Sequence, residues 1–178
     1  RVPALVRWPG KIPAGKISNE IMSMQDWVPT LMAAAGEADV KEKLMKGHKA
    51  DGKKFKVHLD GFNLLPYMTG EEEKSARDEF FYFSDDGSLV GVRHKQWKLV
   101  FAEQRAKTFR VWSEPFVQLR IPKLFNLRSD PFERADTDSN NYDRWWIERS
   151  AFSVVAVQEI VGDFMGTIKD LPPRQKPA

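Results

Sequence analysis

The sequence predicts an α+β protein in which a small antiparallel four-stranded meander packs on a C-terminal helix, preceded by a strand-helix remnant of a larger α/β domain. Short apolar and aromatic runs with tight turns between them follow one another over residues 79–127, which is typical of an antiparallel meander. Residues 151–171 carry one apolar stripe at helical spacing, and Pro172 and Pro173 end it. Residues 1–36 indicate a strand, a loop and a helix, as at the end of an α/β layer.

The composition is that of a folded protein, because 42% of the 178 residues are hydrophobic and 30% are charged. The net charge of +3 is small, so we expect no nucleic-acid partner. The chain has no cysteine, which excludes disulfides, thiolate metal sites and cysteine nucleophiles. No apolar run approaches the roughly 18 residues of a membrane span. Because the sequence starts with Arg1 inside an apolar run, we expect a segment cut from a longer protein.

The first part, residues 1–40, is expected to be the truncated end of the larger α/β domain. Residues 1–8 predict a buried strand, and the prolines and glycines of residues 9–15 indicate a loop. Residues 23–35 predict a helix that Ser23 caps and that Gly36 ends. A truncated face would expose apolar side chains and favour self-association. These apolar side chains are Val2, Leu5, Trp8, Trp27 and Leu31.

Residues 41–74 are expected to connect the two parts of the chain. Seven lysines between residues 41 and 56, against Glu42 and Asp51, predict a solvated surface segment. The alternative is a basic patch for an acidic ligand. Phe55 is the one aromatic residue among these lysines, so the stacking surface of a single-strand nucleic-acid groove is not expected.

Residues 75–178 are expected to form a C-terminal α+β subdomain. Apolar and aromatic runs predict strands at residues 79–84, 89–93, 97–101 and 124–127, a further short strand at 108–112, and a loop at 113–122. In the last strand Phe125 and Leu127 share one face, which we expect to point into the core. Asp130-Pro131 then sets the turn toward the final helix.

The residues alone show no cluster with the spacing of a catalytic or metal site. The three histidines are scattered, and none lies at metal-ligand spacing from another. The most concentrated polar group is Glu103-Gln104-Arg105, which follows a predicted strand. Binding residues are often found on loops at the ends of rigid strands, so this group is a candidate site, with a solvated loop as the alternative.

Five stretches of the chain carry a more specific signal. They are RVPALVRWPGKI at residues 1–12, DWVPTL with AAG at 26–36, LDG with LLP and Gly70 at 59–70, GVR with WKL at 91–99, and LFNL with DP and Glu133 at 124–133. In this order they resemble the C-terminal part of the sulfatase family, of the arylsulfatase type within the alkaline-phosphatase-like superfamily.

The resemblance implies that the full-length protein hydrolyses aryl or carbohydrate sulfate esters with a calcium ion and a formylglycine made from Cys or Ser in a C/S-x-P-x-R motif. It implies that these groups lie in a missing N-terminal catalytic domain, and that the parent is periplasmic or secreted. Ser113-Glu114-Pro115 lacks the arginine of that motif. This chain is therefore expected to be inactive, without a catalytic residue, metal or cofactor of its own.

The expected role of the chain is to help shape the substrate cleft. By position, Glu103, Gln104 and Arg105, with His94 behind them, are predicted to contact the non-sulfate part of a sulfated small molecule or glycan. Two alternatives stay open. One is a related phosphatase or phosphodiesterase, since phosphate esters share the tetrahedral anionic chemistry. The other is a non-enzymatic module that binds anionic glycans through the lysines of residues 40–56.

Overall fold

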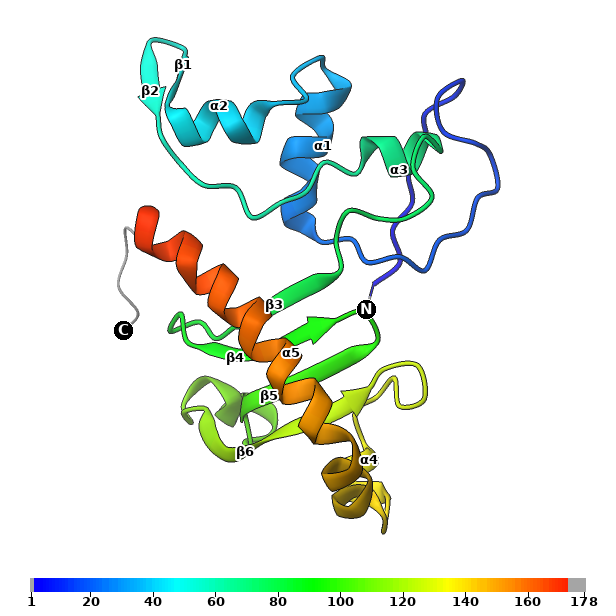
Figure 1. The fold of residues 1–178 in the computed structure, drawn as a ribbon, viewed down its shortest axis with the longest axis vertical. Helices are drawn as coiled ribbons and strands as arrows, with labels where there is room; N and C mark the ends of the chain where they lie inside the picture. Colours follow the sequence, from blue (N-terminus) through cyan, green and yellow to red (C-terminus); the bar gives the residue numbers. More distant parts are fainter. Residues whose placement is uncertain (1, 173–178) are drawn as a thin grey trace. The chain divides into compact units, whose positions relative to one another are not determined.

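The computed structural model describes residues 2–172, except for the side chains of residues 150–154. The chain divides into two compact units, Arg1–Asp78 and Glu79–Ala178 (Figure 1). The finer division at residues 40 and 74 stays a prediction. No helix among the described residues is long and apolar enough to cross a membrane.

The first unit contains short helices and one hairpin. Its elements are η1 (Met24–Asp26), α1 (Trp27–Ala34), α2 (Val40–Lys46), β1 (His48–Ala50), β2 (Lys53–Phe55) and α3 (Leu65–Thr69). η1 and α1 confirm the helix predicted at residues 23–35. The N–H of Ser23 donates to Asp26 Oδ2 at 2.7 Å, which fastens the start of this helix. Gly36 has a φ of +98°, a conformation that glycine adopts without strain, and the helix ends before it.

The strand predicted at residues 1–8 is wrong, because residues 2–8 have no regular secondary structure. Val2 and Leu5 are 87% and 98% exposed. A strand exists only when a neighbouring strand satisfies its backbone hydrogen bonds, and the described part of the chain offers none here. The apolar run therefore stays extended and unpaired, and self-association through it stays a prediction.

The lysine-rich segment, which was expected to be a solvated connection, contains regular secondary structure. Helix α2 is followed by β1 and β2, which pair antiparallel. Asp51 and Gly52 join them with φ values of +48° and +71°. Two successive positive φ values are those of a type I′ hairpin turn, for which Asp-Gly is a preferred sequence.

The second unit confirms the four-stranded antiparallel meander. Strands β3 (Glu79–Phe83), β4 (Leu89–His94), β5 (Trp97–Glu103) and β6 (Val117–Asn126) lie in the order β3-β4-β5-β6. The loop predicted at residues 113–122 is wrong in part, since β6 begins at Val117. Among the described residues β6 pairs only with β5, and an edge strand tolerates Pro122 because its outer side needs no N–H donor.

The further strand predicted at residues 108–112 is wrong: these residues form the 3-10 helix η2 (Thr108–Trp112). Thr108 has a φ of +57°, which is incompatible with an extended chain. Phe109 and Trp112 are exposed rather than packed on the sheet. The β-favouring side chains of this run therefore do not find a neighbouring strand, and the run turns outward.

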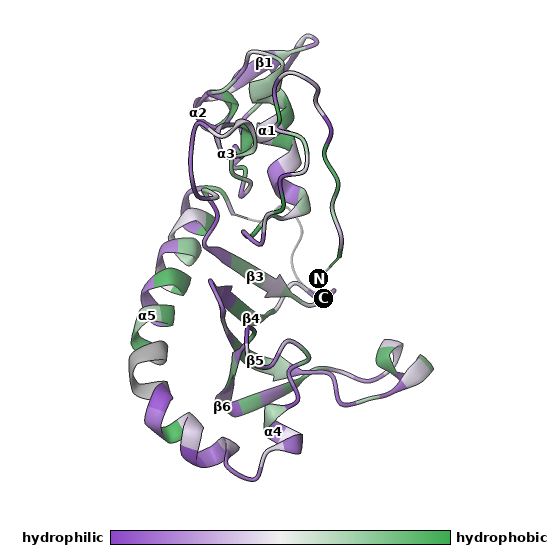
Figure 2. Cartoon of the chain, turned by 90° about the vertical axis from the view of Figure 1, so that its right-hand side faces the viewer, coloured by the Kyte–Doolittle hydropathy of each residue, from purple (hydrophilic) through white to green (hydrophobic). Residues whose placement is uncertain are grey.

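The short helix α4 (Ala135–Asp138) follows β6 in the chain. Helix α5 (Tyr142–Asp170) comes next and covers one face of the sheet (Figures 1 and 2). It includes most of the helix predicted at residues 151–171 but starts nine residues earlier. Its Tyr142 hydroxyl binds both the N–H and the carbonyl of Leu124, at 2.9 and 3.0 Å. Its Trp145 packs against Trp97 of β5. These aromatic contacts stabilise the added turns on the sheet.

The core of the second unit lies between the sheet and α5. Val92, Leu99 and Leu124 come from three neighbouring strands, and Val157 comes from the helix. Phe125 and Leu127 are buried, but neither belongs to this core, into which we expected them to point. Because adjacent residues of a strand point to opposite faces, Phe125 lies on the other face of the sheet from Leu124.

Candidate functional site

The predicted polar group lies at the end of β5 and is held by an ion-pair network. Lys123 of β6 donates from Nζ to Glu103 Oε2 and to Asp136 Oδ2, both at 2.6 Å. Arg105 donates from Nε to Glu103 Oε1 at 2.8 Å. Glu103 therefore connects β5, β6 and the start of the loop, while Asp136 links the same lysine to α4.

The network shifts the ionisation of its members. The hydrogen bond from Lys123 is the main cause that lowers the pKa of Glu103 below its usual value, although partial burial opposes it. Burial disfavours the charged form of Lys123, but hydrogen bonds with Asp136 and Glu103 outweigh this and raise the pKa of Lys123. Both groups are thus charged at neutral pH, which suits them to holding the loop.

Gln104 fastens the loop between β5 and β6. Its Nε2 donates to the carbonyl oxygen of Glu114 at 2.6 Å and more weakly to that of Val111 at 3.4 Å. Its Oε1 accepts the N–H of Ala106 at 2.8 Å. Gln104 therefore ties together chain segments on both sides of η2. Of the three predicted residues, Arg105 is the one whose side chain is mostly exposed, at 61%.

The loop carries an aromatic tip, which we define as Phe109 and Trp112 of η2. They are 83% and 78% exposed, and Figure 2 shows the loop extending away from the sheet. Thr108 begins η2 with a positive φ, which is a strained conformation for a β-branched residue. Such strain persists where the surrounding structure enforces it and is frequent at binding sites. The sequence prediction missed this tip because its apolar pattern resembles a strand.

His94 is not brought to this group. It is the last residue of β4 and pairs across the turn with Trp97, at the start of β5. Glu103 is the last residue of β5, roughly 20 Å farther along at about 3.3 Å per residue. His94 Nδ1 is buried and has no hydrogen-bond partner in the part of the chain that the structure describes.

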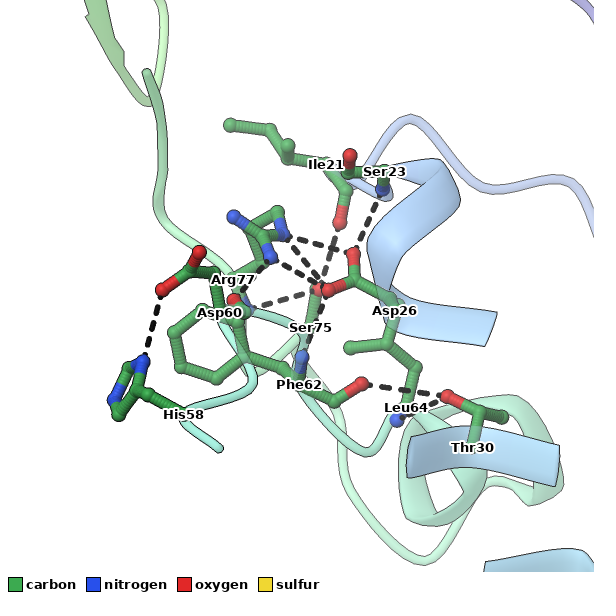
Figure 3. Close-up of polar contacts among 10 residues, drawn as sticks. All are labelled: Ile21, Ser23, Asp26, Thr30, His58, Asp60, Phe62, Leu64, Ser75 and Arg77. Atoms are coloured by element: carbon green, nitrogen blue, oxygen red, sulfur yellow. Dashed lines mark hydrogen bonds and ion pairs between the residues drawn. The ribbon is translucent and has the colours of Figure 1, made fainter. Parts of the chain in front are cut away.

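A second polar cluster lies inside the first unit (Figure 3). Asp26 and Arg77 are 0% and 2% exposed, and Arg77 donates from Nη2 to Asp26 Oδ1 at 2.6 Å and from Nε to Oδ2 at 2.8 Å. Asp26 also accepts the N–H groups of Ser23 and Phe62, at 2.7 and 2.8 Å. Arg77 further donates to the carbonyl oxygen of Asp60 at 2.9 Å.

This second cluster joins three segments that are far apart in the sequence. Closed off from solvent, with the carboxylate satisfied by several donors, it has the properties of a structural ion pair rather than a binding site. Beside it, His58 Nδ1 lies 3.0 Å from Asp60 Oδ1 at a partly exposed position. No group of three or more His, Cys, Asp or Glu side chains that could hold a metal ion occurs among the described residues.

Comparisons with known proteins find similarity to sulfatases. No family model matches the chain. It is 33% identical to N-acetylgalactosamine-6-sulfatase of Canis lupus familiaris over 101 residues, which are 57% of this chain and 16% of that protein. It is 31% identical to arylsulfatase A of Homo sapiens over 143 residues, 75% of this chain and 25% of that protein. The chain thus spans a quarter or less of these two relatives.

A solved structure supports the fold. The PsFucS1 sulfatase from Pseudoalteromonas sp. aligns with a TM-score of 0.69 at 19% identity, over 94% of this chain and 30% of that chain. At this identity the likeness concerns the fold alone. Together with the relatives, it confirms the resemblance to the C-terminal part of the sulfatases and the mixed α+β architecture.

Proposed function

We propose that this chain, which corresponds to the C-terminal part of a sulfatase, works within a longer enzyme that hydrolyses aryl or carbohydrate sulfate esters. One observation carries the proposal: the sequence similarity to several sulfatases extends over about three quarters of the chain. The motifs of the resemblance also occur in the family's order, from residue 1 to residue 133.

In this proposal the nucleophile and the calcium ion belong to the remaining part of the enzyme. The chain has no cysteine, and its S-x-P triplets, Ser113-Glu114-Pro115 and Ser129-Asp130-Pro131, are followed two residues later by Val117 and Glu133 instead of arginine. The described residues also do not fit a calcium site, because no carboxylate cluster is present among them. This chain would therefore act by binding and positioning.

The loop between β5 and β6 is the segment that we assign to the substrate. Glu103 and Gln104 have their polar atoms engaged in bonds within the unit, so their part is to hold the loop. The exposed guanidinium of Arg105 can donate to an anionic or hydroxyl group of the substrate, and the aromatic tip can pack on a ring. His94 would act elsewhere along the sheet, at the β4–β5 turn.

The test begins with the full-length protein. It should contain a C/S-x-P-x-R motif before this segment and should hydrolyse an aryl sulfate faster than the corresponding aryl phosphate. A preference for the phosphate would instead identify the related phosphatase. Absence of the motif together with absence of sulfate release would refute the proposal.

The loop is tested in the same enzyme with a polymeric and a small substrate. Trp112→Ala should lower kcat/KM for a sulfated oligosaccharide about tenfold, equivalent to about 1.4 kcal/mol of binding, mainly through KM. Turnover of a small aryl sulfate should hardly change. Arg128→Ala, at another exposed position of the second unit, is the matched control. Equal effects of the two variants would exclude the loop from substrate binding.

A further inference from the structure

The hairpin of the first unit carries a concentration of free positive charge. We call residues 46–56 the lysine hairpin; its lysines are exposed and have no ion-pair partner in the described part of the chain. These residues are Lys46, Lys49, Lys53, Lys54 and Lys56. By contrast, the neighbouring Lys43 forms ion pairs with both Glu37 and Asp39. The lack of an ion-pair partner thus distinguishes the lysines of the hairpin from Lys43.

The strand register places like charges together. Lys49 lies directly opposite Lys54 in the β1–β2 pair, and Ala50 lies opposite Lys53. Directly opposite residues share one face of an antiparallel pair, and like charges there destabilise it. The tight turn at Asp51 and Gly52 fixes this register. Folding gains nothing from the arrangement, whereas a bound anion would relieve the repulsion.

The surroundings favour one kind of anion. Lys56 follows Lys54 by two residues, so an extended chain continues the charged face by about 7 Å. This spacing suits a polymer that carries separate charged groups along its length. Single-strand nucleic acids need aromatic stacking surfaces, and Phe55 is the one aromatic residue in the hairpin. Lysine ammonium groups bind anions as point charges, without the geometry of a bidentate fork.

We propose that the lysine hairpin binds the sulfate groups of a sulfated polysaccharide and holds such a polymer on the enzyme. The proposal rests on the proposed function, because that function makes sulfated chains the substrate. It adds a binding site on the first unit, whereas the loop assigned above lies on the second. Nucleic acid and anionic membranes are the competing ligands for the same charge.

The first experiment measures binding without catalysis. Heparin binding by the full-length protein is followed at increasing NaCl for the wild type and for the combined variant Lys49→Gln, Lys53→Gln, Lys54→Gln, Lys56→Gln. We expect the dissociation constant to rise about tenfold to a hundredfold, and the slope of log K against log salt to become shallower. The control neutralises four exposed basic residues elsewhere. They are Lys11, Arg120, Arg128 and Lys169, each changed to Gln.

Several results would overturn the proposal. Equal losses in the two variants would mean that net charge alone attracts heparin. The proposal would also be overturned if non-sulfated hyaluronan, duplex DNA or vesicles with anionic lipid bound as tightly as heparin and depended equally on the hairpin. Both variants should melt at the same temperature as the wild type, which would show that the exposed substitutions leave the fold intact.

The second experiment separates this proposal from the proposed function. In an active full-length enzyme, the hairpin variant should raise KM for a sulfated polysaccharide about tenfold and leave hydrolysis of a small aryl sulfate unchanged. Failure of the wild type to hydrolyse any sulfate ester would refute the proposed function, while heparin binding by the variants still decides the role of the hairpin. An unchanged KM for the polymer would refute the hairpin proposal alone.

Discussion

Replacement of Asp26 by alanine should destabilise the first unit strongly. The carboxylate is fully buried and accepts hydrogen bonds from the Arg77 guanidinium and from the N–H groups of Ser23 and Phe62. Its removal leaves the buried Arg77 guanidinium without the carboxylate that offsets its charge, which costs about 3–5 kcal/mol. A unit of 78 residues is stable by about 4–12 kcal/mol. We therefore expect Asp26→Ala to remove a large part of the stability of this unit.

Urea unfolding of the chain measures the total effect, and hydrogen exchange of the Phe62 amide localises it. That amide should exchange faster in Asp26→Ala, because its acceptor is gone. Adding Arg77→Ala should cost less than the sum of the two single changes, by at least about 2 kcal/mol, since the pair is lost only once. Glu148→Gln, which breaks the exposed Arg144–Glu148 pair, should cost less than about 0.5 kcal/mol. A cost for Asp26→Ala as small as that of this control would refute the reasoning.

Two further predictions concern backbone packing and pH. Gly61→Ala should destabilise the first unit by about 3 kcal/mol or more, because its Cβ would lie 2.1 Å from a backbone carbonyl oxygen. The Cβ of Gly162→Ala in α5 meets no neighbour, so this change should stabilise the second unit by up to about 1 kcal/mol. Thermal unfolding of both variants checks the two predictions, and a loss of stability at both sites would contradict them. The lowered pKa of Glu103 means that its contribution is present above its unfolded-state pKa, near 4.5, and is lost as the pH falls through the folded pKa. Lys123→Met should therefore flatten the acid limb of stability in urea unfolding at a series of pH values, whereas an unchanged acid limb would refute this role for the ion pair.

The meander was predictable because its information is local. Asp85-Asp86-Gly87 and the short segment His94-Lys95-Gln96 mark turns between neighbouring runs, and consecutive strands joined by tight turns pair antiparallel. The strand expected at residues 1–8 failed for the converse reason. Its apolar pattern describes a buried environment, but a strand also requires a partner that the described chain does not supply. The hairpin at Asp51-Gly52 carried a usable turn signal, which the density of lysines obscured.

The candidate site was predictable only up to its position. Glu103 could be placed at a strand end, but its partner Lys123 lies 20 residues away on a strand whose start was expected to be a loop. The ion pair of Asp26 with Arg77 spans 51 residues and leaves no local pattern. Charge pairing between distant segments depends on the register and packing of the fold, which periodicity does not report. The exposed Trp112 was missed because an aromatic residue in an apolar run is normally assigned to the core.

The family motifs and the proposed binding residues lie in different parts of the chain, and the structure gives a reason. Polar residues of the motifs are occupied with the backbone: Asp26 binds the N–H of Phe62, and Asp130 accepts the N–H groups of Arg134 and Ala135 at 3.0 and 2.8 Å. These contacts specify how loops join helices, so similarity at the motifs reports the fold. The loop at residues 104–116 and the lysine hairpin lie outside all five stretches. Because many side chains there are exposed and less constrained by packing, these two segments can change in sequence without loss of the fold. Under the two proposals, they are where enzymes that share this architecture should differ in substrate preference.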